Sequence, residues 1–300
     1  MTPRRRRLWG LIGALLLLIL TLPVLVGALL MIVLTLPQCG GETIPPVAHE
    51  DVSFPSAEFD RPTHAWFIPG AGREDSAGPA VIVLPTLALG RGDRMAEALV
   101  YHDLGMHVLM FESRACVGHT SPTLGVAEAE QVGDALAYLA VRPDVDQARV
   151  GLHGFSAGGA AALMGAAQFP AAAAVAQGNY SDFAASLEEA TGQLGLLKPG
   201  FDLGARLGYR LMTGRSLADL SPLNAMPLIT PRPVLLVYGS LEGALSSGRD
   251  LLAAGLASGG DVTLWEVPGA SHGDYFAVAG DEYAERVGGF MAAALNLNQP

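Results

Sequence analysis

Hydrophobic positions divide the chain into one long apolar stretch and a larger region in which short apolar runs alternate with helical patterns. The first stretch, residues 8–36, contains no charged residue. At about 1.5 Å per residue, a helix of this length reaches about 43 Å, and one membrane span needs about 20 residues. The stretch therefore predicts one long or tilted transmembrane helix, in which Pro23 can introduce a kink.

A cleaved signal peptide is the alternative interpretation of this stretch. Its apolar region would normally run about 7–15 residues and end at a small-x-small site. The run here is longer, and Leu36-Pro37-Gln38-Cys39 lacks such a site. Lipoprotein-type cleavage before Cys39 remains open, although Gln38 is a poor neighbour for it. We expect an uncleaved anchor.

Charges on the two sides of the apolar stretch predict its orientation. Arg4 to Arg7 precede it, no Lys or Arg follows until Arg61, and the nearest later charges are acidic. The positive-inside rule therefore places residues 1–7 in the cytoplasm and residues from about 40 onward outside. A disulfide between Cys39 and Cys116 is chemically permitted there, and free thiols remain the alternative.

From residue 51 onward, apolar runs typical of strands alternate with Ala- and Leu-rich segments of helical spacing. We expect a stalk over 37–50 and one domain over 51–300, interrupted by a mainly helical cap insertion at about 181–230 that contains several glycines. Alternating strands and helices predict a mostly parallel sheet with helices on both faces. The expected strands are 52–54, 64–68, 80–84, 107–111, 149–153, 172–176, 233–238 and 262–267, and the expected helices include 91–104, 124–141, 157–168 and 280–295.

Composition excludes several classes of protein. Half of the 300 residues are hydrophobic, which is enough for a large core and excludes a disordered chain. The net charge of −11 leaves little room for the basic face of a nucleic-acid binder. Two cysteines exclude a disulfide scaffold. We find no G-x-G-x-x-G, phosphate-loop or H-E-x-x-H pattern, so we expect neither a cofactor nor a metal.

The chemistry of the chain is indicated by Gly154-Phe155-Ser156-Ala157-Gly158, which matches G-x-S-x-G. The pattern alone arises easily in a glycine-rich chain. Here it follows the apolar run 150–152 and precedes an Ala-rich helical segment, which is the strand–turn–helix setting that the motif requires. Ser156 is therefore the predicted nucleophile, and it needs a base.

We expect the base to come last in the chain. His272 is the histidine that follows the last predicted strand, in a loop of small residues. Glu242 is the first carboxylate after the strand 233–238 and is the predicted acid that orients His272. Asp182, after the preceding strand, is the alternative acid, and Asp250 is a weaker one because it lies within the following helix.

An oxyanion hole needs two backbone N–H groups. Ala157 supplies one, and the other is expected from the loop 85–90; Pro85 has no N–H, so Thr86 or Leu87 donates, and we favour Leu87. Among the other histidines, His107 and His153 lie in strands and are expected in the core, whereas His119 is in a loop that could border the site.

With these motifs the chain resembles the α/β-hydrolase superfamily from about residue 52 to 295. Phe111-Glu112-Ser113-Arg114 with Gly118-His119-Thr120-Ser121 is similar to the stretch after the fourth strand of the family. Tyr238-Gly239-Ser240-Leu241-Glu242 is similar to its acid loop. Gly269-Ala270-Ser271-His272-Gly273-Asp274 is similar to the ending of membrane-anchored and dipeptidyl-peptidase-like members. Two positions depart from the family: Pro85-Thr86 replaces the usual His-Gly, and Glu242 replaces the usual Asp.

The resemblance implies a serine hydrolase with a Ser-His-Glu triad and an acyl-enzyme intermediate. We expect a membrane-anchored, extracytoplasmic enzyme that cleaves carboxylic esters of small molecules or lipids and needs no cofactor. A peptidase or amidase on the same fold, or an inactive hydrolase-like interaction protein, are the alternatives. The apolar insertion and the anchor favour a lipophilic substrate.

Overall fold

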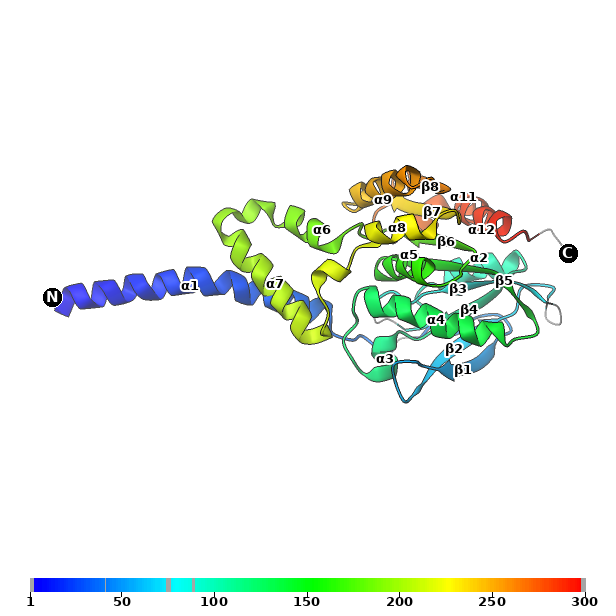
Figure 1. Ribbon diagram of the computed structural model, residues 1–300, viewed down its shortest axis with the longest axis horizontal. Coiled ribbons are helices and arrows are strands. Elements are labelled where there is room, and N and C mark those ends of the chain that lie inside the picture. The colour runs from blue at the N-terminus through cyan, green and yellow to red at the C-terminus, as the bar shows by residue number, and fades with distance from the viewer. Residues whose placement is uncertain (1–2, 41, 74–76, 88–89, 298–300) are drawn as a thin grey trace. The chain divides into compact units, whose positions relative to one another are not determined.

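The computed structural model describes residues 3–40, 42–73, 77–87 and 90–297. Met1 and Thr2 of the predicted cytoplasmic tail, and Ala88 and Leu89 of the predicted oxyanion loop, lie outside these residues. The described chain forms two compact units (Figure 1). One contains residues 1–36 and an insertion, Phe183–Asp219. The other contains residues 37–182 and 220–300 and is called the hydrolase unit below, after the family that its sequence resembles.

The hydrolase unit is built on one eight-stranded sheet in the order β1-β2-β4-β3-β5-β6-β7-β8. The strands are β1 (Glu50–Pro55), β2 (Pro62–Ile68), β3 (Gly78–Val83), β4 (His107–Phe111), β5 (Val145–Phe155), β6 (Ala173–Gln177), β7 (Val234–Gly239) and β8 (Val262–Val267). β1 pairs with β2, and β2 with β4, in the antiparallel sense, and all other pairs are parallel. The predicted mostly parallel sheet is confirmed.

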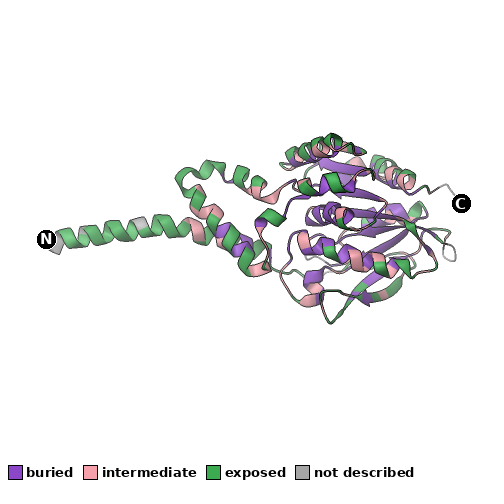
Figure 2. Ribbon diagram, viewed as in Figure 1, coloured by how far each residue is buried: buried purple, intermediate pink, exposed green. Residues whose placement is uncertain are grey.

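Helices cover both faces of this sheet because its central strands are apolar on both sides. One face packs against α4 (Val126–Ala140), α5 (Ala157–Gln168), α8 (Pro222–Ile229) and α9 (Leu245–Ala257). The other packs against α2 (Met95–Asp103), α10 (Tyr275–Ala279), α11 (Asp281–Tyr283), the π-helical segment Ala284–Gly288 and α12 (Gly289–Ala294). The expected closing helix 280–295 thus contains a π-helical turn, and α3 (Arg114–Gly118) was not expected. Figure 2 shows the sheet and α5 as the buried centre of this unit.

The first unit consists of α1 (Pro3–Leu34), α6 (Phe183–Ala190), α7 (Lys198–Thr213) and the short 3-10 helices η1 (Gly192–Leu197) and η2 (Leu217–Asp219). Among the described residues, α1 is the one helix long and apolar enough to cross a membrane. The insertion ends at Asp219, earlier than expected from the sequence, because the next helix, α8, buries Met226 and Ile229 in the core of the hydrolase unit.

A disulfide joins Cys39 to Cys116, with 5.6 Å between the two Cα atoms. It settles the alternative that the sequence left open. Beside it, Glu42 forms a bidentate ion pair with Arg91, with both N···O distances 2.8 Å. A Cβ on Gly92 would lie only 2.2 Å from the carbonyl oxygen of Thr43. The stalk is therefore packed onto the hydrolase unit rather than left as a free linker.

Candidate active site

Ser156 lies in the tight turn between β5 and α5. Its φ of 54° and ψ of −120° are unfavourable for a residue with a side chain, and such strain is typical of functional positions. A Cβ on Gly154 would lie 2.0 Å from the carbonyl oxygen of Gly158, and one on Gly158 would lie 2.8 Å from that of Pro85. Both glycines of the motif are therefore required by close backbone contacts.

Glu242 is the carboxylate that the structure places on His272. Its Oε2 lies 3.0 Å from His272 Nδ1, and its side chain is 1% exposed. The same oxygen accepts a 2.6 Å hydrogen bond from Tyr275 Oη, and Oε1 accepts one of 3.0 Å from the backbone N–H of Gly239. A buried carboxylate held by three donors is fixed in position and compensated for its lost hydration.

Backbone hydrogen bonds fasten the loop that carries Glu242 to the loop that carries His272. The N–H groups of Ser240 and Leu241 donate to the carbonyls of Val267 and Ala270, and Gly269 N–H donates to Ser240 Oγ. A Cβ on Gly239 would lie 2.3 Å from the carbonyl oxygen of Ala270. The two loops follow the neighbouring strands β7 and β8, so the sheet brings the acid and the histidine together.

The imidazole of His272 also packs against the serine turn. Its ring centroid lies 4.7 Å from that of Phe155, the residue before Ser156. A Cβ on Gly178 would lie 3.0 Å from His272 Nδ1, and Gly178 follows Gln177, whose carbonyl accepts the N–H of Ser156 at 2.8 Å. The structure thus brings Ser156, His272 and Glu242 to the carboxyl ends of β5, β8 and β7, where open parallel sheets bind ligands.

This arrangement sets the proton positions that base catalysis requires. A carboxylate facing Nδ1 favours the tautomer with its proton on Nδ1, which leaves the Nε2 lone pair free to accept a proton. The His272 side chain is 48% exposed, so the imidazole is accessible. Burial and the hydrogen bond to Glu242 raise the pKa of Tyr275, so its hydroxyl stays protonated and acts as a donor.

Ala157 and Leu87 are the two backbone donors that the sequence predicts for an oxyanion hole. Ala157 is the first residue of α5, so its N–H has no acceptor within the helix. The second candidate, Leu87, has a φ of 47°, a left-handed conformation that non-glycine residues rarely adopt. The contact of Gly158 with Pro85 shows that the loop containing Leu87 borders the start of α5.

The other predicted residues lie on different elements of the chain. Asp182 immediately precedes α6, and Asp250 lies in α9, where Oδ2 is 3.5 Å from Ser181 Oγ. His119 is exposed and ends α3 with a left-handed φ of 50°. His107 and His153 are fully buried, as expected. Tyr101 Oη lies 2.6 Å from His153 Nδ1, and burial lowers the pKa of His153 to about 3, so this imidazole is neutral.

Two neighbours of the site escaped sequence reasoning. Tyr275, three residues after His272, binds the acid, and the guanidinium carbon of Arg94 lies 4.5 Å from the centre of the Phe155 ring. Tyr275 stands at the start of a helix directly after the histidine loop, and this position was a signal that it lies near the site. Arg94, just before α2, contacts Phe155 of β5, and a contact between such distant segments has no local sequence signature.

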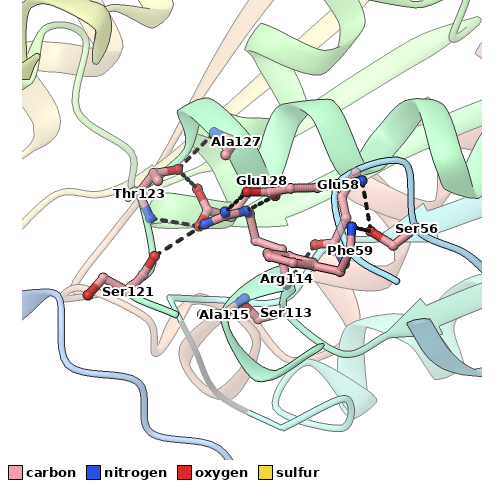
Figure 3. Close-up of polar contacts among 11 residues, drawn as sticks. Ser56, Glu58, Phe59, Ser113, Arg114, Ala115, Ser121, Thr123, Ala127 and Glu128 are labelled. Carbon is pink, nitrogen blue, oxygen red and sulfur yellow. Dashed lines mark hydrogen bonds and ion pairs between the residues drawn. The ribbon is translucent and has the colours of Figure 1, made fainter. Parts of the chain in front are cut away.

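The segment after β4 that resembles a family motif has a structural role here. Figure 3 shows the ion pair between Arg114 and Glu58, in which Arg114 Nε lies 2.7 Å from Glu58 Oε2. Arg114 Nη1 also donates to the carbonyl of Ser121 at 3.2 Å. Glu128 accepts hydrogen bonds of 2.8 Å from the N–H groups of Thr123 and Gly125. Arg114 and Glu128 therefore hold the connection between β4 and α4 in place.

Comparisons with known proteins agree with this architecture. An esterase from Pyrococcus furiosus superposes with a TM-score of 0.64 at 19% identity, over 86% of this chain and 98% of the esterase. An α/β hydrolase from a Penicillium species superposes with a TM-score of 0.62 at 18% identity, over 83% of this chain and 100% of that hydrolase. An acylaminoacyl peptidase from Pyrococcus horikoshii gives 0.60 at 17% identity, over 81% of this chain and 41% of the peptidase.

Similarity in sequence is more limited. An uncharacterised protein from two strains of Mycobacterium tuberculosis is 33% identical over 119 residues, which are 40% of this chain. The match spans about two fifths of the length of that relative, 42%. No family model matches the chain. The structural matches show the fold of the hydrolase unit.

Proposed function

We propose that this chain, which has the α/β-hydrolase fold, is a membrane-anchored serine hydrolase that cleaves carboxylic esters outside the cytoplasm. The observation that carries the proposal is the hydrogen bond between buried Glu242 and His272, whose ring packs against the strained turn of Ser156. A structural histidine needs neither a buried carboxylate on Nδ1 nor a strained serine beside it. These features together are the machinery of nucleophilic acyl transfer.

In this mechanism, His272 Nε2 takes the proton of Ser156 while Oγ attacks the ester carbonyl. The N–H groups of Ala157 and Leu87 bind the oxyanion, and the alcohol leaves with the proton from His272. A water molecule then attacks the acyl-serine while His272 takes one of its protons. His272 passes that proton to Ser156 Oγ as the carboxylic acid leaves, which restores both residues. Glu242 keeps its negative charge throughout and stabilises the imidazolium.

The proposed location is supported by three observations. α1 is long and apolar enough to span a bilayer, and Arg4 to Arg7 precede it. The disulfide between Cys39 and Cys116 favours an oxidising compartment for the hydrolase unit. An enzyme tethered to lipid in this way meets lipophilic esters at high local concentration, so we propose these as its substrate class.

The first test is covalent labelling of the full chain, purified in detergent, with a fluorophosphonate probe. We expect labelling of the wild type and its loss in Ser156→Ala and His272→Ala. Ser258→Ala is the matched control, because Ser258 ends α9 and donates to the carbonyl of Ala254. If folded wild-type protein stays unlabelled, Ser156 is not activated and the chain is a non-catalytic relative.

Substrate profiling then separates esters from amides. We expect p-nitrophenyl esters of medium and long acyl chains to be cleaved faster than short-chain esters and than the matching anilides. Faster cleavage of peptides or anilides would assign the same site to a peptidase or amidase. Comparable rates for short, soluble esters would remove the support for a lipophilic substrate.

A further inference from the structure

Helix α7 carries three separate stripes, each made of residues four apart. The glycine stripe contains Gly200, Gly204 and Gly208. The leucine stripe contains Leu203, Leu207 and Leu211, which are 52%, 52% and 78% exposed. The charged stripe contains Lys198, Asp202, Arg206 and Arg210. At about 100° per residue, the leucine stripe lies about 60° from the glycine stripe, and the charged stripe lies on the opposite side of the helix.

The glycine stripe packs directly against α1. A Cβ on Gly204 would lie 1.9 Å from the carbonyl oxygen of Val24, and one on Gly208 would lie 2.5 Å from that of Ala28. In return, a Cβ on Gly27 would lie 2.1 Å from the carbonyl oxygen of Phe201. The backbones of the two helices therefore touch, as they do where small residues pair helices in membranes.

This contact brings the leucine stripe beside the exposed surface of α1. Between Leu25 and Leu34, every exposed position of α1 is Leu or Val. Because the exposed positions on both sides of α1 are Leu or Val, the leucine stripe continues the apolar surface of α1. η1 lengthens this surface at the start of α7 with Leu194, Leu196 and Leu197, which are 38%, 100% and 43% exposed.

Three of the four residues of the charged stripe, in contrast, form ion pairs. Lys198 Nζ binds Asp202, and Arg206 Nη2 lies 3.0 Å from Glu188 of α6. A helix with a leucine face and a charged face is typical of segments that lie in the plane of a membrane interface. A soluble protein rarely leaves a contiguous surface of this kind uncovered.

We propose that α7 lies at the surface of a phospholipid bilayer, with its leucine stripe among the acyl chains and its charged stripe in water. The occupant of the leucine face is lipid, because that face continues the lipid-facing surface of α1 and ends where the charges begin. The inference rests on the membrane span of α1 in the proposed function. It makes the insertion a second membrane-bound element of the chain.

The test uses the full chain in vesicles of phosphatidylglycerol and phosphatidylethanolamine. Both native cysteines are in the disulfide, so a single added cysteine can be labelled with the fluorophore NBD. The variants are L207C and L211C on the leucine stripe, R210C on the charged stripe as the matched control, and L18C as the reference within α1. Each must keep the circular dichroism spectrum of the wild type, which verifies that the chain is folded.

We expect blue-shifted emission at positions 207 and 211, with about threefold stronger quenching by doxyl-labelled acyl chains than at position 210. Equal, weak quenching at 207 and 210 alongside strong quenching at 18 overturns the inference and leaves the anchor intact. A blue shift at 207 without quenching overturns it in favour of a protein contact. Weak quenching at 18 rejects the membrane span and the inference together, while labelling of Ser156 tests the hydrolase separately.

Discussion

Tyr275 Oη donates a 2.6 Å hydrogen bond to Glu242 Oε2, the oxygen that also lies 3.0 Å from His272 Nδ1. One carboxylate oxygen therefore holds both the imidazole and a tyrosine, and the tyrosine fixes the direction in which the acid faces. A hydrogen bond to a charged group contributes about 1.5–3 kcal/mol. We therefore expect Tyr275 to position Glu242 rather than to contact the substrate.

Replacing Tyr275 by Phe removes this donor and leaves the ring in place. We expect kcat to fall about tenfold with little change in KM, since a less firmly held Glu242 orients His272 less well. Steady-state kinetics on an ester substrate measure the split. Phe276→Leu, at the next position, is the control; an unchanged kcat in Y275F would show that the hydrogen bond does not serve catalysis.

The acid itself is tested by Glu242→Gln, which keeps size and loses charge. An amide next to Nδ1 no longer stabilises the imidazolium and can select the wrong tautomer, so we expect kcat to fall about a thousandfold or more. Asp182→Asn is the comparison, because Asp182 is the rival acid of the sequence. A larger loss in D182N than in E242Q would transfer the role to Asp182.

Asp93 gives the pH dependence of stability a defined sign. Burial raises the pKa of its carboxyl from 3.8 to about 6. The folded protein therefore binds this proton more tightly than the unfolded chain does. As the pH rises from about 4 through 6, the buried carboxyl must ionise, and the free energy of unfolding falls. Asp93→Asn removes this cost.

We expect D93N to gain up to about 3 kcal/mol relative to the wild type between pH 4 and pH 7, since one pKa unit corresponds to about 1.4 kcal/mol. Urea unfolding across this range, followed by circular dichroism, measures the difference. Asp103→Asn is the control, because the Asp103 side chain is 77% exposed. A pH-independent difference between D93N and the wild type would contradict the assignment.

The disulfide stabilises the hydrolase unit because it lowers the conformational entropy of the unfolded chain. It links residues 77 positions apart, so breaking it restores the entropy of a long loop, about 4 kcal/mol. We expect the C39S/C116S double variant to lose stability of this order in urea unfolding. The control is the wild type with and without reductant, which should reproduce the loss; an equal midpoint in all samples would mean that the noncovalent stalk contacts suffice.

Close packing of α7 on α1 is tested at Gly204. A methyl group there collides with the carbonyl of Val24, so Gly204→Ala should separate the two helices. Gly13→Ala is the control, because no atom lies within 4 Å of the position of its Cβ. Hydrogen exchange of α7 should rise at least about tenfold in G204A and stay unchanged in the Gly13 variant.

Local pattern predicted those parts of the molecule that depend on neighbours in sequence. The strand β4 and the helix α5 were predicted with their observed bounds, since a run buried on both faces and an Ala-rich segment each have a clear signature. Chain order after each strand gave the candidates Ser156, Glu242 and His272 for the same reason: parallel strands deliver their ends to one edge of the sheet.

What the sequence could not supply depends on contacts between distant segments. The cysteines at 39 and 116 gave no sign of their pairing, because it requires the stalk to fold back onto α3. From the sequence, the glycines of α7 were only part of a helical insertion, whereas in the structure Gly204 and Gly208 lie in contact with α1. A glycine that permits motion and one that permits close packing look the same until the partner helix is known.

The bond between Cys39 and Cys116 also determines where a pulling force on α1 enters the hydrolase unit. Residues 40–115, which include β1 to β4, form a closed covalent ring that carries no tension along its backbone while the bond is intact. A pull on the anchor reaches Cys116 through residues 35–39 alone, just beyond β4 in the interior of the sheet. In the proposed membrane-anchored enzyme, the intact bond therefore keeps tension on α1 from reaching the edge strand β1 along the backbone.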